Sequence, residues 1–175
     1  MNKIFLTVAL VGLFGMTSSY ASAQATTPVD NLMCKYNSAK FLPALKASVV
    51  SFLTSNIKFA WDPASIKISC AKQAESFIDE RTCAVIFQAK DKTVFFLRDR
   101  AQCFTDQWGH SHCSDTSNWT LSNISLLKQQ KTDEEGNFTG PVTCKATIYG
   151  AEIVNKKTSV ILPTNKDFPE VSYQQ

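Results

Sequence analysis

Apolar residues recur at intervals of three and four positions between about Ser38 and Asn56, a period that predicts an amphipathic helix. Its apolar face is expected to consist of Phe41, Leu42, Leu45, Val49, Phe52 and Leu53. Ser38 has the side chain of a helix cap, and Asn56 is expected to end the helix. Because proline is tolerated only in the first helical turn, Pro43 places the start of the regular helix as late as Leu42.

Beyond this helix the apolar period changes to two, which is typical of β-strands. Strands are expected at about 57–61, 66–70, 82–89, 93–98, 119–130, 141–149 and 151–162, with the last folded back at 155–157. The segments 82–89 and 93–98 are apolar on both faces, as central strands are. Residues 101–118 follow neither period and are expected to form an irregular loop.

This order of elements predicts an α+β fold for residues 24–175 as a single globular domain. One N-terminal amphipathic helix is expected to pack on the concave face of a curved, mostly antiparallel meander sheet. Residues 24–33 are expected to form a flexible lead-in. Residues 163–175 hold two prolines and show no period, so they are expected to form a loose C-terminal tail.

The first 23 residues have the three parts of a secretory signal peptide. Lys3 supplies a positive charge, Ile4 to Met16 an apolar stretch, and Ala21 to Ala23 the small residues of a cleavage site. An apolar stretch of this length falls short of the roughly 20 residues that span a bilayer. We therefore expect cleavage after Ala23, a bacterial type of export, and a secreted or periplasmic mature chain without a membrane span.

The six cysteines all follow this segment, and an even number in an exported chain predicts a set of disulfide bonds. Fifteen pairings are possible. The positions of the cysteines relative to the predicted elements favour one of them: Cys103–Cys113 across the loop, Cys70–Cys83 between two strands, and Cys34–Cys144 from the remainder. No two cysteines of the sequence are spaced as C-x2-C, so a structural zinc site is not indicated.

Composition and charge then narrow the classes of function. The chain is 44% hydrophobic and 19% charged, as globular proteins are, and its formal net charge is +3. That charge is too small, and too little clustered, to indicate binding to nucleic acid. The densest basic run, 90–100, already contains Asp91 and Asp99 and is expected to be a solvated strand edge.

Catalytic motifs are absent from the sequence, which has no G-x-S-x-G, H-E-x-x-H, P-loop or G-x-G-x-x-G pattern. The two histidines, His110 and His112, lie two positions apart, so in an extended segment their imidazoles face the same side. With Asp106 or Asp115 they form the only candidate set for zinc or copper. The same pair is the candidate acid and base of a small secreted hydrolase. The simpler interpretation is a polar loop that contains two histidines.

Trp108 is the most distinctive residue of the bridged loop. A tryptophan on a loop that a disulfide holds at its base is a common anchor in recognition, although the same side chain can fold back into the core. Trp108, His110 and His112 are therefore the candidate binding residues.

The sequence favours an exported, non-enzymatic protein that binds a protein or another macromolecule, as a periplasmic accessory factor, an inhibitor or a secreted effector. No cofactor is expected. The alternatives are the hydrolase and a weak zinc- or copper-binding protein.

Overall fold

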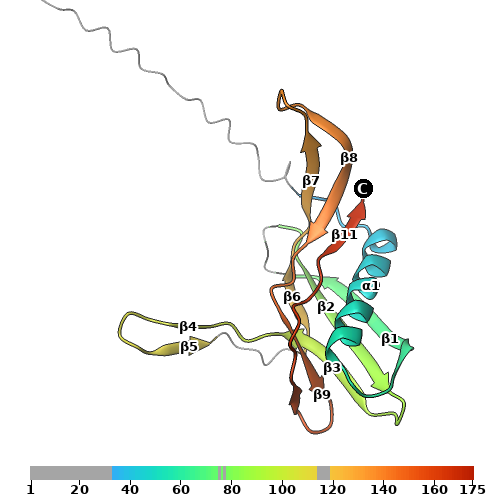
Figure 1. Ribbon diagram of the computed structural model, residues 1–175. Helices are drawn as coiled ribbons and strands as arrows, with labels where there is room; N and C mark the ends of the chain where they lie inside the picture. The colour runs from blue at the N-terminus through green and yellow to red at the C-terminus, as the bar shows by residue number, and fades with distance from the viewer. Residues whose placement is uncertain (1–32, 75, 77, 114–118) are drawn as a thin grey trace, which may run out of the picture.

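A computed structural model describes residues 33–74, 76, 78–113 and 119–175. The predicted signal peptide and nearly all of the predicted lead-in lie outside the described residues. Within them the chain forms one helix and a larger body of antiparallel strands, which confirms the α+β class (Figure 1). No helix in these described ranges is long and apolar enough to cross a bilayer.

The helix α1 spans Ser38–Asn56 and begins earlier than Pro43 alone suggested. Asn37, and not Ser38, is the capping residue, because its side-chain oxygen accepts a hydrogen bond from the backbone N–H of Lys40 at 3.4 Å. Pro43 lies inside the helix. The N–H that proline lacks would have bonded to the carbonyl of Ala39, and that turn is exposed, so water can take the place of the missing donor.

The largest sheet runs in the order β1-β2-β3-β9-β10, and β6 pairs with β2 outside this path. Its strands are β1 (Trp61–Lys72), β2 (Arg81–Ala89), β3 (Val94–Asp99), β6 (Leu121–Ile124), β9 (Ala151–Asn155) and β10 (Ile161–Leu162). The sequence predicted two strands, 57–61 and 66–70, whereas the structure has one strand, β1, that begins only at Trp61. Near Asp62 and Pro63 this strand is irregular, because its register with β2 shifts between Asp62 and Lys67.

A single meander sheet was the wrong expectation. The meander ends at β3, whose next neighbour in the sheet is β9. Between Asp99 and Ala151 the described part of the chain returns to this sheet only with β6, which pairs with β2. This stretch contains β7 and β8, which form a second sheet in the order β11-β8-β7 with the C-terminal strand β11. It also contains β4 and β5, which form a two-stranded ribbon. The bounds of these strands are β4 Cys103–Thr105, β5 Ser111–Cys113, β7 Leu127–Thr132, β8 Phe138–Ala146 and β11 Val171–Gln174. Figure 1 shows the ribbon standing away from the rest of the molecule.

The strand expected at 119–130 is two strands, β6 and β7, in two different sheets. Asn123 has a positive φ of 53°, a conformation that regular strands do not contain. The chain passes to the second sheet just after this residue, and both Ile124 and Leu126 are buried at the passage. In this segment apolar residues occupy both odd and even positions, because the chain passes from one sheet to the other.

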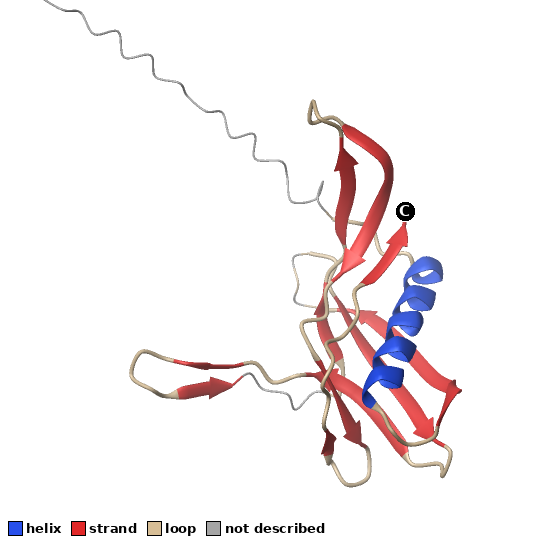
Figure 2. Ribbon diagram, viewed as in Figure 1, coloured by secondary structure: helices blue, strands red, loops and turns tan. Residues whose placement is uncertain are grey.

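The loose tail expected at 163–175 is also corrected. Strand β11 pairs with β8 along its length, with Tyr173 opposite Cys144, and Val171 is fully buried. Phe168 packs against Phe52 of α1, with the ring centroids 5.1 Å apart. The end of the chain therefore covers part of the helix face, and Figure 2 shows β11 running beside α1. The two prolines interrupt the apolar pattern, but both precede β11, so they do not prevent this strand from forming.

The core lies between α1, the largest sheet and β11. The helix contributes its buried positions Phe41, Leu45, Ser48, Val49, Phe52 and Leu53. The strands contribute large side chains that are fully buried, among them Val85, Phe87, Leu97, Leu121 and Ile153. Burial of this many apolar side chains is the main source of the stability of the fold.

The disulfide bonds of the structure are Cys34–Cys144, Cys70–Cys83 and Cys103–Cys113, the pairs that the sequence favoured. No cysteine is free. Cys34 and Cys144 are buried in the core, whereas Cys103 and Cys113 are exposed. Because such bonds persist only where thiols are oxidised, three of them indicate a protein of an oxidising compartment.

Candidate functional site

The β4–β5 hairpin, residues 103–113, contains all three candidate binding residues. Its strands pair Cys103 with Cys113 and Phe104 with His112, so the disulfide closes the end of the hairpin nearest the body. The six strand residues are exposed. The expected irregular loop is therefore a stapled hairpin up to Cys113, and the rest of the expected loop, 114–118, lies outside the described residues.

The tip of the hairpin is a tight turn that glycine makes possible. The backbone N–H of Gly109 donates to the carbonyl of Asp106 at 3.0 Å, and the N–H of Asp106 donates to the carbonyl of His110 at 2.9 Å. Gly109 has a φ of +86°, a conformation that side chains disfavour. The turn holds Trp108 at the outermost part of the hairpin.

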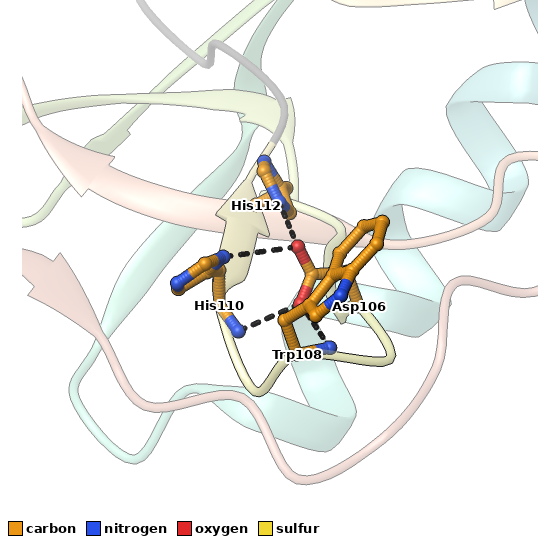
Figure 3. Close-up of polar contacts among 4 residues, drawn as sticks. All are labelled: Asp106, Trp108, His110 and His112. Carbon is orange, nitrogen blue, oxygen red and sulfur yellow. Dashed lines mark hydrogen bonds and ion pairs between the residues drawn. The ribbon is translucent and has the colours of Figure 1, made fainter.

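Asp106 organises the polar groups of the tip through one carboxylate (Figure 3). Its Oδ1 accepts hydrogen bonds from the backbone N–H groups of Trp108 at 2.9 Å and His110 at 2.8 Å. Its Oδ2 lies 3.2 Å from Nδ1 of His110 and 3.0 Å from Nε2 of His112. The hydrogen bond with His112 is the main reason that the pKa of Asp106 lies below its ordinary value, and the two backbone N–H groups lower it further.

The aromatic side chains of the hairpin face solvent. Trp108 is 73% exposed and Phe104 is 66% exposed, so Trp108 does not fold back into the core. The Phe104 ring stacks on the His112 imidazole with centroids 5.1 Å apart and planes inclined by 21°. The hairpin thus presents one free indole at its tip and one supported phenyl ring on its side.

The histidines give limited support to catalysis. Each has the carboxylate partner that a general base needs, but both stand on an exposed ribbon where no surrounding residues keep water away. Among the described residues, no three His, Cys, Asp or Glu side chains are arranged to hold a metal ion. Asp115, the other expected oxygen ligand, lies outside the described residues. The Asp106 carboxylate occupies the position between the imidazoles.

Two features of the hairpin were not found from the sequence. Asp106 was considered only as a metal ligand, and Phe104 was not considered. The signal for Asp106 was its place two residues before Trp108 and four before His110, the spacing at which an aspartate accepts backbone N–H groups in a turn. Phe104 became significant only with the strand register that sets it opposite His112.

A second titratable group lies near the base of the hairpin. Asp99 ends β3 and lines a small cavity of about 190 Å³ together with Arg100, Ser122 and Tyr149. Burial raises the pKa of Asp99, although its Oδ2 accepts a hydrogen bond from the N–H of Ser122 at 2.9 Å. The bond fixes β6 beside the end of β3, so the carboxylate has a structural task.

Comparison with known proteins adds no assignment, because no family model, curated protein or solved structure matches this chain.

Proposed function

We propose that this chain is an exported, disulfide-bonded binding protein whose β4–β5 hairpin contacts another macromolecule, a protein being the partner that its chemistry favours. The observation that carries this proposal is the exposed Trp108 on a hairpin that is ordered without a core of its own. A disulfide at its base and the Asp106 hydrogen bonds at its tip hold the backbone that carries the indole in place before any partner arrives. Such preorganisation lowers the entropy cost of binding.

The same geometry supports the non-enzymatic part of the proposal. A flat and exposed arrangement of aromatic and polar groups suits contact with a surface, whereas a small substrate needs a concave site that buries most of it. Export through a signal peptide at 1–23 fits the oxidising compartment that the disulfides indicate. Mass measurement of the exported product tests the cleavage, and the expected product begins at Gln24. A periplasmic accessory factor, an inhibitor and a secreted effector all fit this description.

Substitution of the indole tests the proposal. The partner is first captured with the mature wild-type protein and identified, and its affinity is then measured by calorimetry with both purified components. Trp108→Ala should weaken the affinity about tenfold or more, because truncation of a central aromatic residue in an interface costs about 2 kcal/mol.

Phe138→Ala provides the matched control. Phe138 is an equally exposed aromatic residue, 74% accessible, at the start of β8 in the β11-β8-β7 sheet. Its affinity should equal that of the wild type. Equal affinities for the Trp108 variant and the wild type would rule out the hairpin as the binding element.

A further inference from the structure

An open groove lies at the far end of the largest sheet. It has a volume of about 680 Å³ and runs between the segment after α1, the β2–β3 turn and the β9–β10 turn. Its apolar lining comes from Phe59, Phe95, Val160 and Leu162. We call it the end groove. These apolar side chains lie together and not singly, which makes the end groove a candidate contact surface.

A series of aromatic rings leads from the core to the end groove. Phe95 stacks on the buried Phe87 with centroids 5.3 Å apart and planes inclined by 16°. Phe59 stacks on Phe95 at 5.1 Å and 27°, and it is 37% exposed. The series thus ends in an accessible ring, and a further aromatic side chain could extend it with the same offset geometry.

The charges around the end groove complement those of the hairpin. Lys90 and Asp91 of the β2–β3 turn line the groove. Lys92 in the same turn and Lys156 and Lys157 in the β9–β10 turn lie beside these lining segments, so the two turns together carry four lysines and one aspartate. Residues 103–113 contain one aspartate, two histidines and no lysine or arginine, so their formal net charge is −1 with the histidines neutral. A hairpin of net negative charge is attracted to a surface of net positive charge.

The hairpin of one molecule cannot occupy its own end groove. The groove includes Thr93, just before β3, and Phe95 near its start, whereas the hairpin follows Asp99 at the end of the same strand. In Figure 1 the hairpin extends sideways, away from the turns that border the groove. The two surfaces are therefore at opposite ends of a rigid strand, and only a different molecule can bring them together.

We propose that the partner of the hairpin is a second copy of this chain, in which Trp108 of one molecule enters the end groove of the next. The inference rests on the proposed function, since it takes the hairpin as the binding element, and it adds the identity of the surface that is bound. Because the two contacting surfaces differ, the association is head-to-tail and can continue from copy to copy.

Mixing two variants tests this arrangement. Trp108→Ala removes the inserted side chain and leaves the groove intact. Val160→Lys places a charge in the groove and leaves the hairpin intact, and Val160 is 55% exposed, so the fold should tolerate the change. The average mass is measured by analytical ultracentrifugation from about 1 µM to about 1 mM, the range of dissociation constants expected for a small interface.

The wild type and the Phe138→Ala control should increase in average mass with concentration. Each interface variant alone should stay monomeric. An equimolar mixture of the two variants should form a complex of two chains and grow no further, because each complex keeps only one damaged hairpin and one damaged groove at its ends. Circular dichroism and thermal unfolding check that both variants are folded.

A wild type that is monomeric throughout the range overturns the inference, as does a mixture that stays monomeric or an association that survives Trp108→Ala. The proposed function is judged separately by a partner captured from the source. If Trp108→Ala abolishes capture of a different protein while the wild type stays monomeric, the hairpin remains the binding element and the second copy is excluded as its partner.

Discussion

At the scale of the residue, one carboxylate explains how the hairpin is ordered. Three-residue strands that are exposed on both sides bury too little apolar surface to hold a turn. Asp106 replaces that missing core with bonds to two backbone N–H groups and two imidazoles. The order of the tip therefore depends on the ionised form of a single side chain.

This dependence predicts a response to pH. Because the pKa of Asp106 is lowered in the folded hairpin, its contribution is complete above the ordinary value of 3.8 and is lost as the pH falls through the lowered value. Asp106→Asn keeps an acceptor but removes the charge. At neutral pH the backbone amides of Trp108 and His110 should then exchange with solvent about threefold faster or more, as measured by NMR.

Asp91→Asn is the control for this experiment. Asp91 accepts a hydrogen bond from the N–H of Thr93 in the β2–β3 turn, at 2.9 Å, with no histidine partner. Its substitution should leave exchange in the hairpin unchanged. If the Asp106 variant also exchanges at the wild-type rate, the carboxylate does not order the tip.

At the scale of the element, the C-terminal strand shows where sequence patterns fail. Strand β11 has four residues, too few for a period of two to be distinguished, and prolines precede it. Its place in the fold is set by β8, which lies far away in the sequence, and by the helix face that it helps to cover. The period of 38–56 was readable because a helix of 19 residues repeats its pattern several times.

Val171→Ala tests the structural role of β11. Val171 is fully buried, so the loss of two methyl groups should lower the free energy of unfolding by about 2 kcal/mol. Urea unfolding monitored by fluorescence measures this. Ser172→Ala, an exposed neighbour in the same strand, should change the free energy by less than about 0.5 kcal/mol. Equal stabilities for the two variants would mean that the tail is loose after all.

The hairpin and the end groove differ in the same respect: the sequence predicts the first and not the second. Two cysteines that bracket a polar stretch with a glycine predicted the stapled segment and its tryptophan, because all the information is local. The end groove combines segments around Phe59, Phe95 and Val160, which only the sheet order brings together. No pattern along the chain marks those residues as neighbours, since each has the ordinary appearance of a strand or turn residue.

At the scale of the whole molecule, the disulfides differ in what they hold. Cys34–Cys144 lies in the core and closes a loop with a sequence separation of 110. Cys103–Cys113 is exposed and closes only the hairpin, with a separation of 10. Reduction of the first requires the core to open, whereas a thiolate reaches the second directly.

Reduction should therefore occur in a fixed order. At low concentrations of a thiol reductant, alkylation and peptide mass mapping should show Cys103 and Cys113 modified first, while circular dichroism of the body is unchanged. Cys34 and Cys144 should react only as the protein unfolds, because loss of a bridge over such a loop costs about 4 kcal/mol or more. Simultaneous modification of all the cysteines would contradict this order.

The bond between Cys34 and Cys144 also makes most of the described chain a covalent ring. A protease that cuts once between these residues opens the ring without releasing any fragment, so the two sides of the cut stay at high effective concentration and can remain assembled. A cut after Cys144 and before Val171, in contrast, frees the segment that closes over α1. Resistance to digestion is thus unequally distributed, and the 26 residues from 145 to 170 decide it.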